Sequence, residues 1–466
     1  MASYLKRLID TYLNLWAISE RHKPLLLRGA RQVGKSTAVR ELGRKFRYFV
    51  EINFERNPEY MALFETNLDV ERIIPQMAAI CGLPIEDGNT LLFLDEIQAC
   101  PKAIMALRFF KEDRPALHVI AAGSLLELAL QQIPTFGVGR IHSMFMYPMT
   151  FDEFLEANNE QLLMQIRNNS TPASPLPDLL HNKLTELFRT YLMVGGMPEA
   201  VQRWVDTHDY LQCQEVHNDI LISYEDDFPK YNRHVDPILL RLTLHSAAVQ
   251  VTHKFSYADV GGGYRTEEIK RAVEMLILAG LIIPVTLSSA NGLPLGSESN
   301  HSFRKMLILD QGIMLRILSL TMDKGREMAT HILTSTAADL VNKGPMAEMT
   351  AGLELRRYRS PDIRQEMFYW ARANRNAQAE IDYLSTYHGN IVPIEIKAGA
   401  RGGMKSMWIF MREKQLNFGV RSSLENFASL TYTDAEAGNT VRNVTVCPLY
   451  ALSQLNRLIE ETDSWV

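Results

Sequence analysis

Apolar runs and helical patterns alternate along the first third of the chain. The apolar runs at 25–27, 48–54, 91–94 and 117–122 are typical of buried strands, and helical patterns separate them. Such alternation predicts a parallel α/β sheet, which binds its ligand at the carboxyl ends of the strands. Ahead of the first strand, apolar residues at helical spacing over 5–16 predict a helix.

The pattern changes in the rest of the chain. The Ser/Pro/Asn-rich stretch at 165–178 predicts a linker, and helical patterns dominate after it. The segment 257–285 combines a Gly-rich turn, a helix from about Thr266 and a strand, which predicts a winged helix-turn-helix. From about residue 335 a helical run precedes three strands, "EMFYWAR", "AEIDYLSTY" and "IVPIEIKAG".

Composition narrows the class of protein. The 466 residues are 46% hydrophobic and 22% charged, and their length predicts about three domains. The net charge of −5 gives no global basic field for nucleic acid. The four cysteines have no zinc-site spacing and predict no disulfide framework, which fits a reducing cytoplasm. Charged residues interrupt the N-terminal apolar pattern, and the run 275–285 is too short to span a membrane, so we expect a soluble cytoplasmic protein.

A nucleotide-binding pattern follows the first strand. "GARQVGKS" fits G-x-x-x-x-G-K-[ST], with a strand before it and a helical pattern after it. Glycines let the backbone wrap phosphates, and the helix N-terminus offers free N–H groups to them. Lys35 would reach the β- and γ-phosphates of ATP, and Ser36 would bind Mg²⁺. The predicted nucleotide-binding residues are Gly29, Ala30, Arg31, Gln32, Val33, Gly34, Lys35, Ser36 and Thr37.

The strand "TLLFLDEIQ" carries a second match. Asp95 would hold Mg²⁺ through water, and Glu96 would polarise the attacking water. The alternative is an ordinary strand that ends in an acidic helix cap. The N/T-K-x-D guanine signature is missing near the later strands, which favours ATP over GTP.

Two further residues have candidate roles in hydrolysis. Ser124 ends the strand in "ALHVIAAGS" and is either a γ-phosphate sensor or a structural serine. Arg140 precedes an apolar strand at 141–147. It is either a solvated loop arginine or a finger that stabilises the transition state, in cis or from a neighbouring subunit of an oligomer.

The winged-helix segment is a candidate DNA contact. Arg265, Lys270 and Arg271 could meet phosphates, which would make 255–285 a DNA-binding region. Modules of this kind can equally serve only to pack against their neighbours.

Acidic residues in the last strands suggest a metal centre. Asp382 lies in one strand, and Glu395 and Lys397 lie in the next, which gives the D-x(12)-E-x-K layout of the PD-(D/E)XK nuclease core. Two carboxylates on adjacent strands can share Mg²⁺, and a nearby lysine can orient or deprotonate a bound water. The alternative is a cross-strand salt bridge on a half-buried sheet face.

Taken together, these stretches resemble a prokaryotic family of AAA+-like P-loop ATPases. Its C-terminal domain, of uncharacterised function, has a restriction-endonuclease-like fold. The matching stretches cover nearly the whole chain: "LLLRGARQVGKST", "LLFLDEIQ", "LHVIAAGSLLELAL", "GRIHSMFMYPMTFDEF", "YLMVGGMPEA" and "VPIEIKAG".

The resemblance implies roles for the residues already named. It gives the nucleotide loop as Gly29–Ser36, Asp95 and Glu96 as the Mg²⁺ and water pair, Ser124 as sensor and Arg140 as finger. In the C-terminal part it implies Asp382, Glu395 and Lys397 as catalytic positions, with Glu348 on the preceding helix as a further metal ligand. Ile381 stands where the motif has Pro, a change that many such nucleases tolerate.

We therefore expect a multidomain α/β protein. The predicted domains are an AAA+-like P-loop ATPase at 1–155, a helical and winged-helix region at 156–330, and a nuclease-like domain at 331–466. The expected function is Mg²⁺-dependent ATP hydrolysis coupled to binding or processing of DNA. The alternatives are an ATP-driven signalling switch or a protein remodeller, with the nuclease-like fold serving as a non-catalytic interaction platform.

Overall fold

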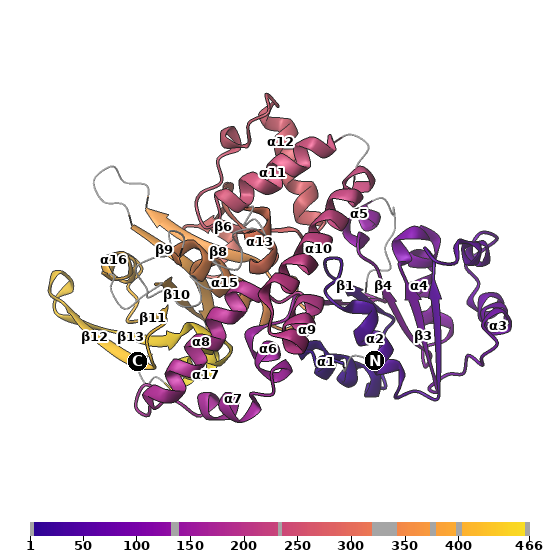
Figure 1. Ribbon diagram of the computed structural model, residues 1–466, viewed down its shortest axis with the longest axis horizontal. Helices are drawn as coiled ribbons and strands as arrows, with labels where there is room; N and C mark the ends of the chain where they lie inside the picture. Colours follow the sequence, from indigo (N-terminus) through magenta and orange to yellow (C-terminus); the bar gives the residue numbers. More distant parts are fainter. Residues whose placement is uncertain are drawn as a thin grey trace.

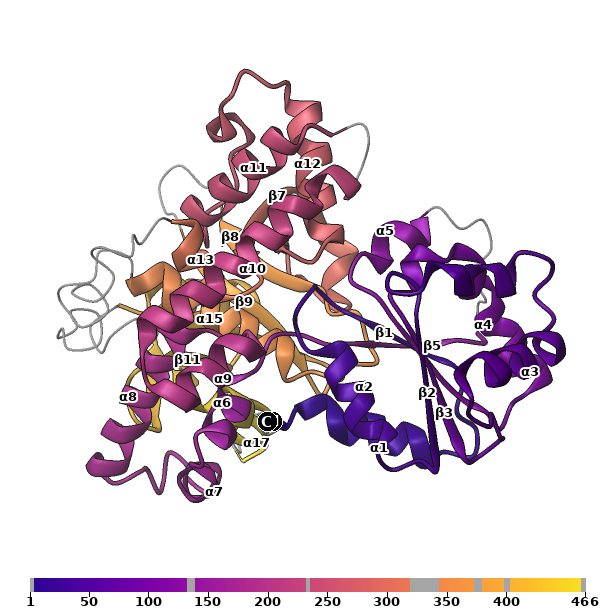
Figure 2. The same ribbon diagram turned by 45° about the vertical axis from the view of Figure 1, so that its right-hand side comes forward.

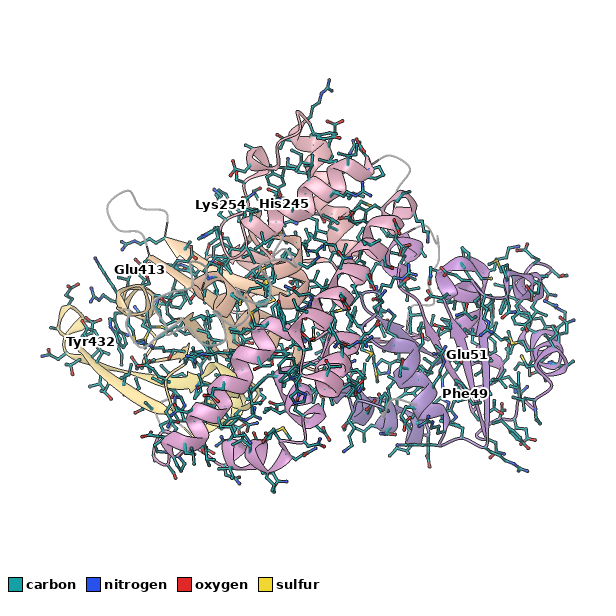
Figure 3. The ribbon with its side chains drawn as sticks, viewed as in Figure 1. Phe49, Glu51, His245, Lys254, Glu413 and Tyr432 are labelled. Atoms are coloured by element: carbon teal, nitrogen blue, oxygen red, sulfur yellow. The ribbon has the colours of Figure 1, made fainter. Side chains whose placement is uncertain are left out.

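Two β-sheets lie at opposite sides of the molecule, with helices between and above them (Figure 1). The computed structural model describes six stretches of the chain: 4–131, 139–231, 235–318, 343–372, 379–397 and 403–461. In Figure 3, Phe49 and Glu51 mark the first sheet at one side of the molecule, and Glu413 and Tyr432 mark the C-terminal region at the other side.

The first sheet is parallel and five-stranded, in the order β2-β3-β4-β1-β5. Its strands are β1 (Leu25–Arg28), β2 (Tyr48–Asn53), β3 (Thr90–Asp95), β4 (His118–Ala122) and β5 (His142–Phe145). Its helices are α1 (Leu8–Ile18), α2 (Lys35–Gly43), α3 (Val70–Cys81), α4 (Pro101–Asp113) and α5 (Leu126–Gln131). The predicted parallel α/β sheet and N-terminal helix are confirmed.

Side chains of this sheet alternate between two apolar cores, as the pleat of a strand requires. Leu25 and Leu27 of β1 join a large core that continues through the helices into the second sheet. Leu26 points to the other face, into a separate core beneath α3 and α4. One face of the first sheet therefore packs into the same apolar core as the helices and the second sheet.

A helical layer follows the first sheet. Its members are α6 (Phe151–Ala157), α7 (Gln161–Asn168), α8 (Asp178–Val194), α9 (Pro198–Thr207) and α10 (Tyr210–Tyr231). The predicted linker at 165–178 is wrong at its start, because α7 extends to Asn168 and Arg167 is fully buried. Arg167 pairs with Asp152 and donates to the carbonyl of Tyr450, so contacts remote in sequence order this stretch.

Two helices and a hairpin form a lobe above the other regions (Figure 2). They are α11 (Pro237–Val249), α12 (Thr266–Leu278), β6 (Ile282–Ser288) and β7 (Ser299–Ile308). The predicted helix start at Thr266 is confirmed. β6 and β7 pair antiparallel, with a register shift at Thr286/Leu287.

The second sheet has eight strands in the order β12-β13-β11-β10-β9-β8-β6-β7. The later strands are β8 (Met367–Arg372), β9 (Ala379–Tyr387), β10 (Asn390–Ile396), β11 (Phe418–Ser423), β12 (Ala428–Asp434) and β13 (Thr440–Pro448). The accompanying helices are α13 (Gln311–Ile317), α15 (Lys343–Arg357), α16 (Lys405–Glu413) and α17 (Leu455–Glu460). Because β6 pairs with β8, the sheet crosses the domain boundary predicted at residue 331.

Within the described ranges, none of the helices combines the length and the apolar character that crossing a bilayer requires.

Candidate functional site

The loop between β1 and α2 has the backbone that a phosphate cradle needs. Gly29 (φ 145°) and Gly34 (φ 98°) adopt left-handed conformations that favour glycine. A Cβ atom on Gly29 would lie 2.2 Å from the carbonyl oxygen of Met146, so no larger residue fits there. α2 begins at Lys35, which directs its free N–H groups toward the loop.

Lys35 is buried, and its ammonium group stays inside the loop. Its Nζ donates hydrogen bonds to the carbonyl oxygens of Gly29 (2.9 Å) and Ala30 (2.7 Å). Burial lowers the pKa of Lys35 to about 8, although the negative charges of Glu96 and Asp95 act to raise it. These carbonyl contacts are weak partners for an ammonium compared with phosphate oxygens.

Asp95 and Ser36 meet at the carboxyl end of β3. The hydroxyl of Ser36 donates to Asp95 Oδ1 (3.0 Å), and the amide of Asn53 donates to Oδ2 (3.2 Å). Burial raises the pKa of Asp95, and the neighbouring Glu96 charge raises it further. A hydroxyl and a carboxylate side by side form the oxygen donor set that Mg²⁺ takes next to nucleotide phosphates, so the residues fit that ion.

Glu96 and Ser124 stand at the ends of β3 and β4, on the same sheet edge. Glu96 has a left-handed backbone (φ 49°), and its carboxylate accepts a hydrogen bond from Gln98 Nε2 (2.7 Å). Gln98 packs so closely that a Cβ atom on Gly123 would lie 1.9 Å from its Oε1. Gln98, which binds Glu96, thus packs against Gly123, the residue that precedes Ser124.

These groups share one cleft of about 960 Å³. Its lining includes predicted loop residues and the three acid and sensor candidates: Arg31, Gln32, Gly34, Lys35, Ser36, Thr37, Asp95, Glu96 and Ser124. The remaining loop residues lie elsewhere, since Val33 is fully buried and Gly29 and Ala30 line a neighbouring pocket. The opposite wall comes from the N-terminal segment and from Pro198, Glu199 and Gln202.

Arg7 lies outside the motif but binds the nucleotide loop. It is buried, pairs with Glu153 (2.9 Å), and donates to the carbonyl oxygens of Val33 and Tyr147 at 2.7 Å each. In the sequence, Arg7 is one of the charged residues that interrupt the N-terminal apolar pattern. The only available signal was its charge at the start of a helix, which says nothing about its distant partners.

Arg31 connects the loop to helix α10. It forms an ion pair with Asp227, and its carbonyl oxygen accepts a hydrogen bond from the hydroxyl of Tyr224 (2.6 Å). Asp227 is buried and also pairs with Lys230 (2.7 Å). The loop is thus tied to the helical layer by a residue that the motif leaves unspecified.

Arg140 does not lie at this site. β1 and β5 are parallel, with Leu25 opposite His142, so Arg140 is at the amino end of the sheet. The nucleotide loop is at the carboxyl end, about 17 Å of strand away. Arg140 is exposed and pairs with Glu112 on α4. This placement does not support the finger role in cis, and the role in trans stays a prediction.

The second candidate site contains the predicted acids of the C-terminal region. β9 and β10 pair antiparallel, which sets Asp382 beside Glu395, and Asp382 accepts a hydrogen bond from Ile396 N (2.7 Å). Carboxylate oxygens of Glu348, Glu380 and Asp382 lie within 4.8 Å of one another. The structure thus brings Glu348 to the cluster, and it adds Glu380, which the sequence pattern did not indicate.

The cation inside this cluster is Lys305 of β7. Its side chain is 2% exposed, its Nζ is 2.9 Å from Glu348 and 4.0 Å from Asp382, and it also pairs with Glu380. The expectation that Lys397 is the neighbouring positive group holds only for Glu395, to which Lys397 donates at 2.5 Å. Lys305 was missed because its segment was assigned to the winged-helix region.

Burial favours the neutral forms of the acids at this second site. It raises the pKa of Glu348 to about 8 and that of Glu395 to about 7, with the Asp382 charge as the next cause for both. Glu395 is 4% exposed, and its Oε2 has no hydrogen-bond partner among the described residues. Glu348, Glu380 and Asp382 together offer an oxygen donor set of the kind that divalent cations take, and Glu395 lies beside Asp382 on the neighbouring strand.

The candidate DNA-binding helix carries both signs of charge. α12 has three acids, and its bases are Lys270 and Arg271, with Arg265 preceding it. Lys270 already pairs with Glu267 (2.8 Å). Phosphate binding needs a cation-rich surface, and the charges described on this helix do not form one.

Comparison with protein families locates three matches. Residues 21–155 match the family model described as "AAA domain". Residues 185–324 and 343–450 match models described as domains of unknown function, DUF8612 and DUF4143. A search of curated proteins found no match. The AAA match and the parallel sheet together support an AAA-like P-loop ATPase domain in the N-terminal part of the chain.

Proposed function

We propose that the protein binds ATP in the cleft beside the loop 29–37 and hydrolyses it. The observation that carries the proposal is the meeting of Lys35, Ser36, Asp95 and Glu96 at one sheet edge. Each group has the chemistry that its position requires: an ammonium for phosphate charge, a hydroxyl and carboxylate for a cation, and a second carboxylate for water.

The residues act by binding and orientation. Lys35 exchanges the carbonyls of Gly29 and Ala30 for phosphate oxygens, which bind an ammonium more strongly. Ser36 and Asp95 would hold Mg²⁺, which supplies neutralisation of phosphate charge when bound. Glu96, positioned by Gln98, accepts a proton from the attacking water as general base.

Two substitutions test this function. Lys35→Ala removes the cation that meets the phosphates, so isothermal titration should detect no ATP binding. Glu96→Gln keeps the shape of the site and loses the base, so ATP should bind while turnover stops. Lys45→Ala is the matched control, because Lys45 is an exposed lysine just beyond α2 that contacts Asn14. Unchanged affinity in Lys35→Ala, or normal turnover in Glu96→Gln, would contradict the assignment.

A second candidate function concerns the C-terminal region. We propose that residues 331–466 form a nuclease-like domain, with Asp382, Glu395 and Glu348 as metal ligands and Lys397 beside them. The cluster of carboxylate oxygens and the unpartnered Glu395 Oε2 support a metal-competent site. Residues 156–330 would then be a helical and winged-helix region, with α11, α12 and the β6–β7 hairpin as the winged helix.

The rival is a non-catalytic interaction platform, driven by ATP as a switch or remodeller. Lys305 favours this rival, because it already occupies the middle of the acids. Incubation with linear, single-stranded and branched DNA in Mg²⁺ or Mn²⁺, with and without ATP, separates the two. DNA cleavage or DNA-stimulated turnover supports the nuclease-like role, and indifference to every DNA supports the platform.

A further inference from the structure

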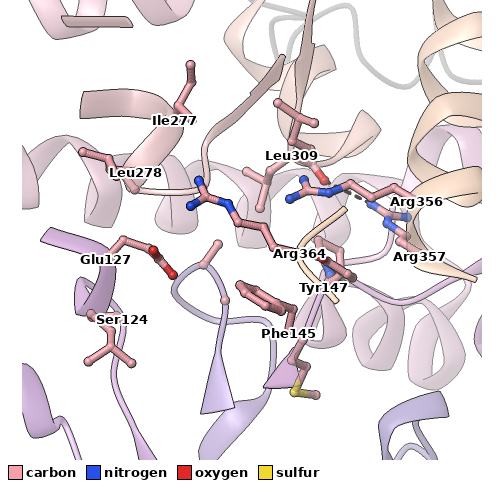
Figure 4. A pocket seen from close by; sticks show the side chains of 18 of the residues that line it. Ser124, Glu127, Phe145, Tyr147, Ile277, Leu278, Leu309, Arg356, Arg357 and Arg364 are labelled. Atoms are coloured by element: carbon pink, nitrogen blue, oxygen red, sulfur yellow. Dashed lines mark hydrogen bonds between the residues drawn. The ribbon is translucent and has the colours of Figure 1, made fainter. Parts of the chain in front are cut away.

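A pocket of about 80 Å³ lies where three regions of the chain meet. The first sheet contributes the start of the nucleotide loop and Ser124, the lobe contributes the end of α12, and the C-terminal region contributes α15 and Arg364. Figure 4 shows Arg364 extending toward Leu278 and Arg356 lying beside Leu309. The pocket wall thus combines apolar side chains with Ser124, Glu127 and three arginines.

Arg356 is the first of these arginines. Its guanidinium lies over the ring of Tyr147, with 4.7 Å from Cζ to the ring centroid. Its Nε is buried without a hydrogen-bond partner, and no carboxylate in the described stretches forms an ion pair with it. Burial lowers the pKa of Arg356, the neighbouring Tyr147 side chain opposes this shift, and the like charges of Arg364 and Arg357 add to it. Arg356 therefore has the Tyr147 ring beside it but no carboxylate partner among the described residues.

The neighbouring charged residues do not neutralise the Arg356 guanidinium. Arg357 is satisfied elsewhere, by Glu354 and by the carbonyl oxygens of Met149 and Leu309. Glu127 is the acid on the pocket wall, and its carboxylate is bound by both Nε and Nη2 of Arg28 at 2.6 and 2.5 Å. Arg364 is exposed and, among the described residues, has no carboxylate partner. Within the described stretches, the pocket therefore holds two arginines that have no carboxylate partner.

We propose that this pocket binds a small anion through a phosphate or carboxylate group, held by Arg356 and Arg364. Planar guanidinium groups bind both anion types with paired hydrogen bonds. Two arginines converging in a partly apolar pocket favour a compact ligand over an extended chain. Arg356 and Arg364 line this pocket and not the adjoining ATP cleft, so the proposal does not depend on ATP hydrolysis.

The bound anion would lie against the nucleotide loop. Gly29 and Ala30 line the pocket, and Ser124 lines both this pocket and the ATP cleft. The turn after α12 also lies close to the nucleotide loop, since a Cβ atom on Gly280 would be 3.4 Å from Cβ of Ala30. An occupant would thus contact the loop, the lobe and α15 together.

The test must separate this site from the nucleotide loop, which also attracts anions. We would use the full chain with Lys35→Ala and titrate inorganic phosphate, then succinate, at constant ionic strength. Binding is followed by calorimetry and by the melting temperature. Phosphate binding alone identifies a phosphate-bearing ligand, and succinate binding identifies a carboxylate; either supports the site.

Arg356→Met and Arg364→Met should each weaken binding by about tenfold or more, because each removes charge-assisted hydrogen bonds. Arg47→Met, an exposed arginine outside the pocket, should leave the affinity unchanged. Arg356→Met should also fold at least as stably without anion, because it removes a half-buried cation that has no carboxylate partner among the described residues. Absence of binding in the Lys35→Ala chain, or equal binding after both pocket substitutions, would overturn the proposal.

Discussion

The Nζ atom of Lys305 on β7 lies 2.9 Å from a carboxylate oxygen of Glu348 on α15. This contact places a lysine of the lobe hairpin inside the acidic cluster of the C-terminal sheet. Whether the cluster takes a metal thus depends on a residue outside the D-x(12)-E-x-K motif.

Lys305→Met should destabilise the protein in metal-free buffer. Removing one partner of a buried ion pair costs about 3–5 kcal/mol, and the side chain of Lys305 is 2% exposed. Mn²⁺ should then bind more tightly than to the unaltered protein and restore the melting temperature. Lys397→Met is the matched control, with a smaller loss because its side chain is 27% exposed. Full stability of Lys305→Met without metal would show that the acids do not need this cation.

Affinity for ATP should fall as the pH rises above 8. Burial lowers the pKa of Lys35 to about 8, so above that pH the free protein holds a neutral amine in the loop. ATP binding needs the charged form, and the Kd should therefore be about tenfold higher at pH 9 than at pH 7. Calorimetry in two buffers at pH 9 should show uptake of about one proton on binding. Equal affinity at both pH values without proton uptake would place the Lys35 pKa higher.

Arg140→Ala should slow hydrolysis only where subunits assemble. Its position at the amino end of β5 leaves a neighbouring subunit as the site at which a finger could act. In an assembly, turnover should fall by roughly 10³-fold with little loss of ATP binding. Mixing Lys35→Ala subunits with Arg140→Ala subunits should restore part of the activity. A monomeric mass together with normal turnover in Arg140→Ala would reject the finger.

Gly123→Ala should impair hydrolysis and spare ATP binding. The new Cβ would fall 1.9 Å from Gln98 Oε1, so Gln98 must move and release Glu96. Misplacing a catalytic base lowers kcat on the order of 10-fold to 100-fold. Gln98→Ala should reproduce the loss, and Gly292→Ala, which meets no neighbour, should have no effect. Normal kcat in both Gly123→Ala and Gln98→Ala would remove Gln98 from the positioning of Glu96.

The nucleotide site was predictable because its chemistry is local. The glycines, Lys35 and Ser36 are adjacent in sequence, and their loop follows a strand whose apolar run is plain. Asp95 and Glu96 end a neighbouring strand, so a parallel sheet brings them to the same edge without further information.

The supporting contacts were not predictable, because they join residues distant in the chain. Arg7 reaches Tyr147, Arg31 reaches Asp227, and Lys305 reaches Glu380. The linker prediction over 165–178 is wrong at its start for the same reason. Its composition resembles a turn, yet Arg167 is fixed by Asp152 and by the carbonyl of Tyr450.

The shared eight-stranded sheet limits how the chain can be cut for experiments. A fragment beginning at residue 331 would lose β6 and β7, expose the edge of β8, and leave the acids without Lys305. An open strand edge invites aggregation, and uncompensated acids weaken what remains. A negative nuclease assay on such a fragment would therefore report on truncation damage, whereas a fragment that begins before α11 would keep hairpin, cation and cluster together.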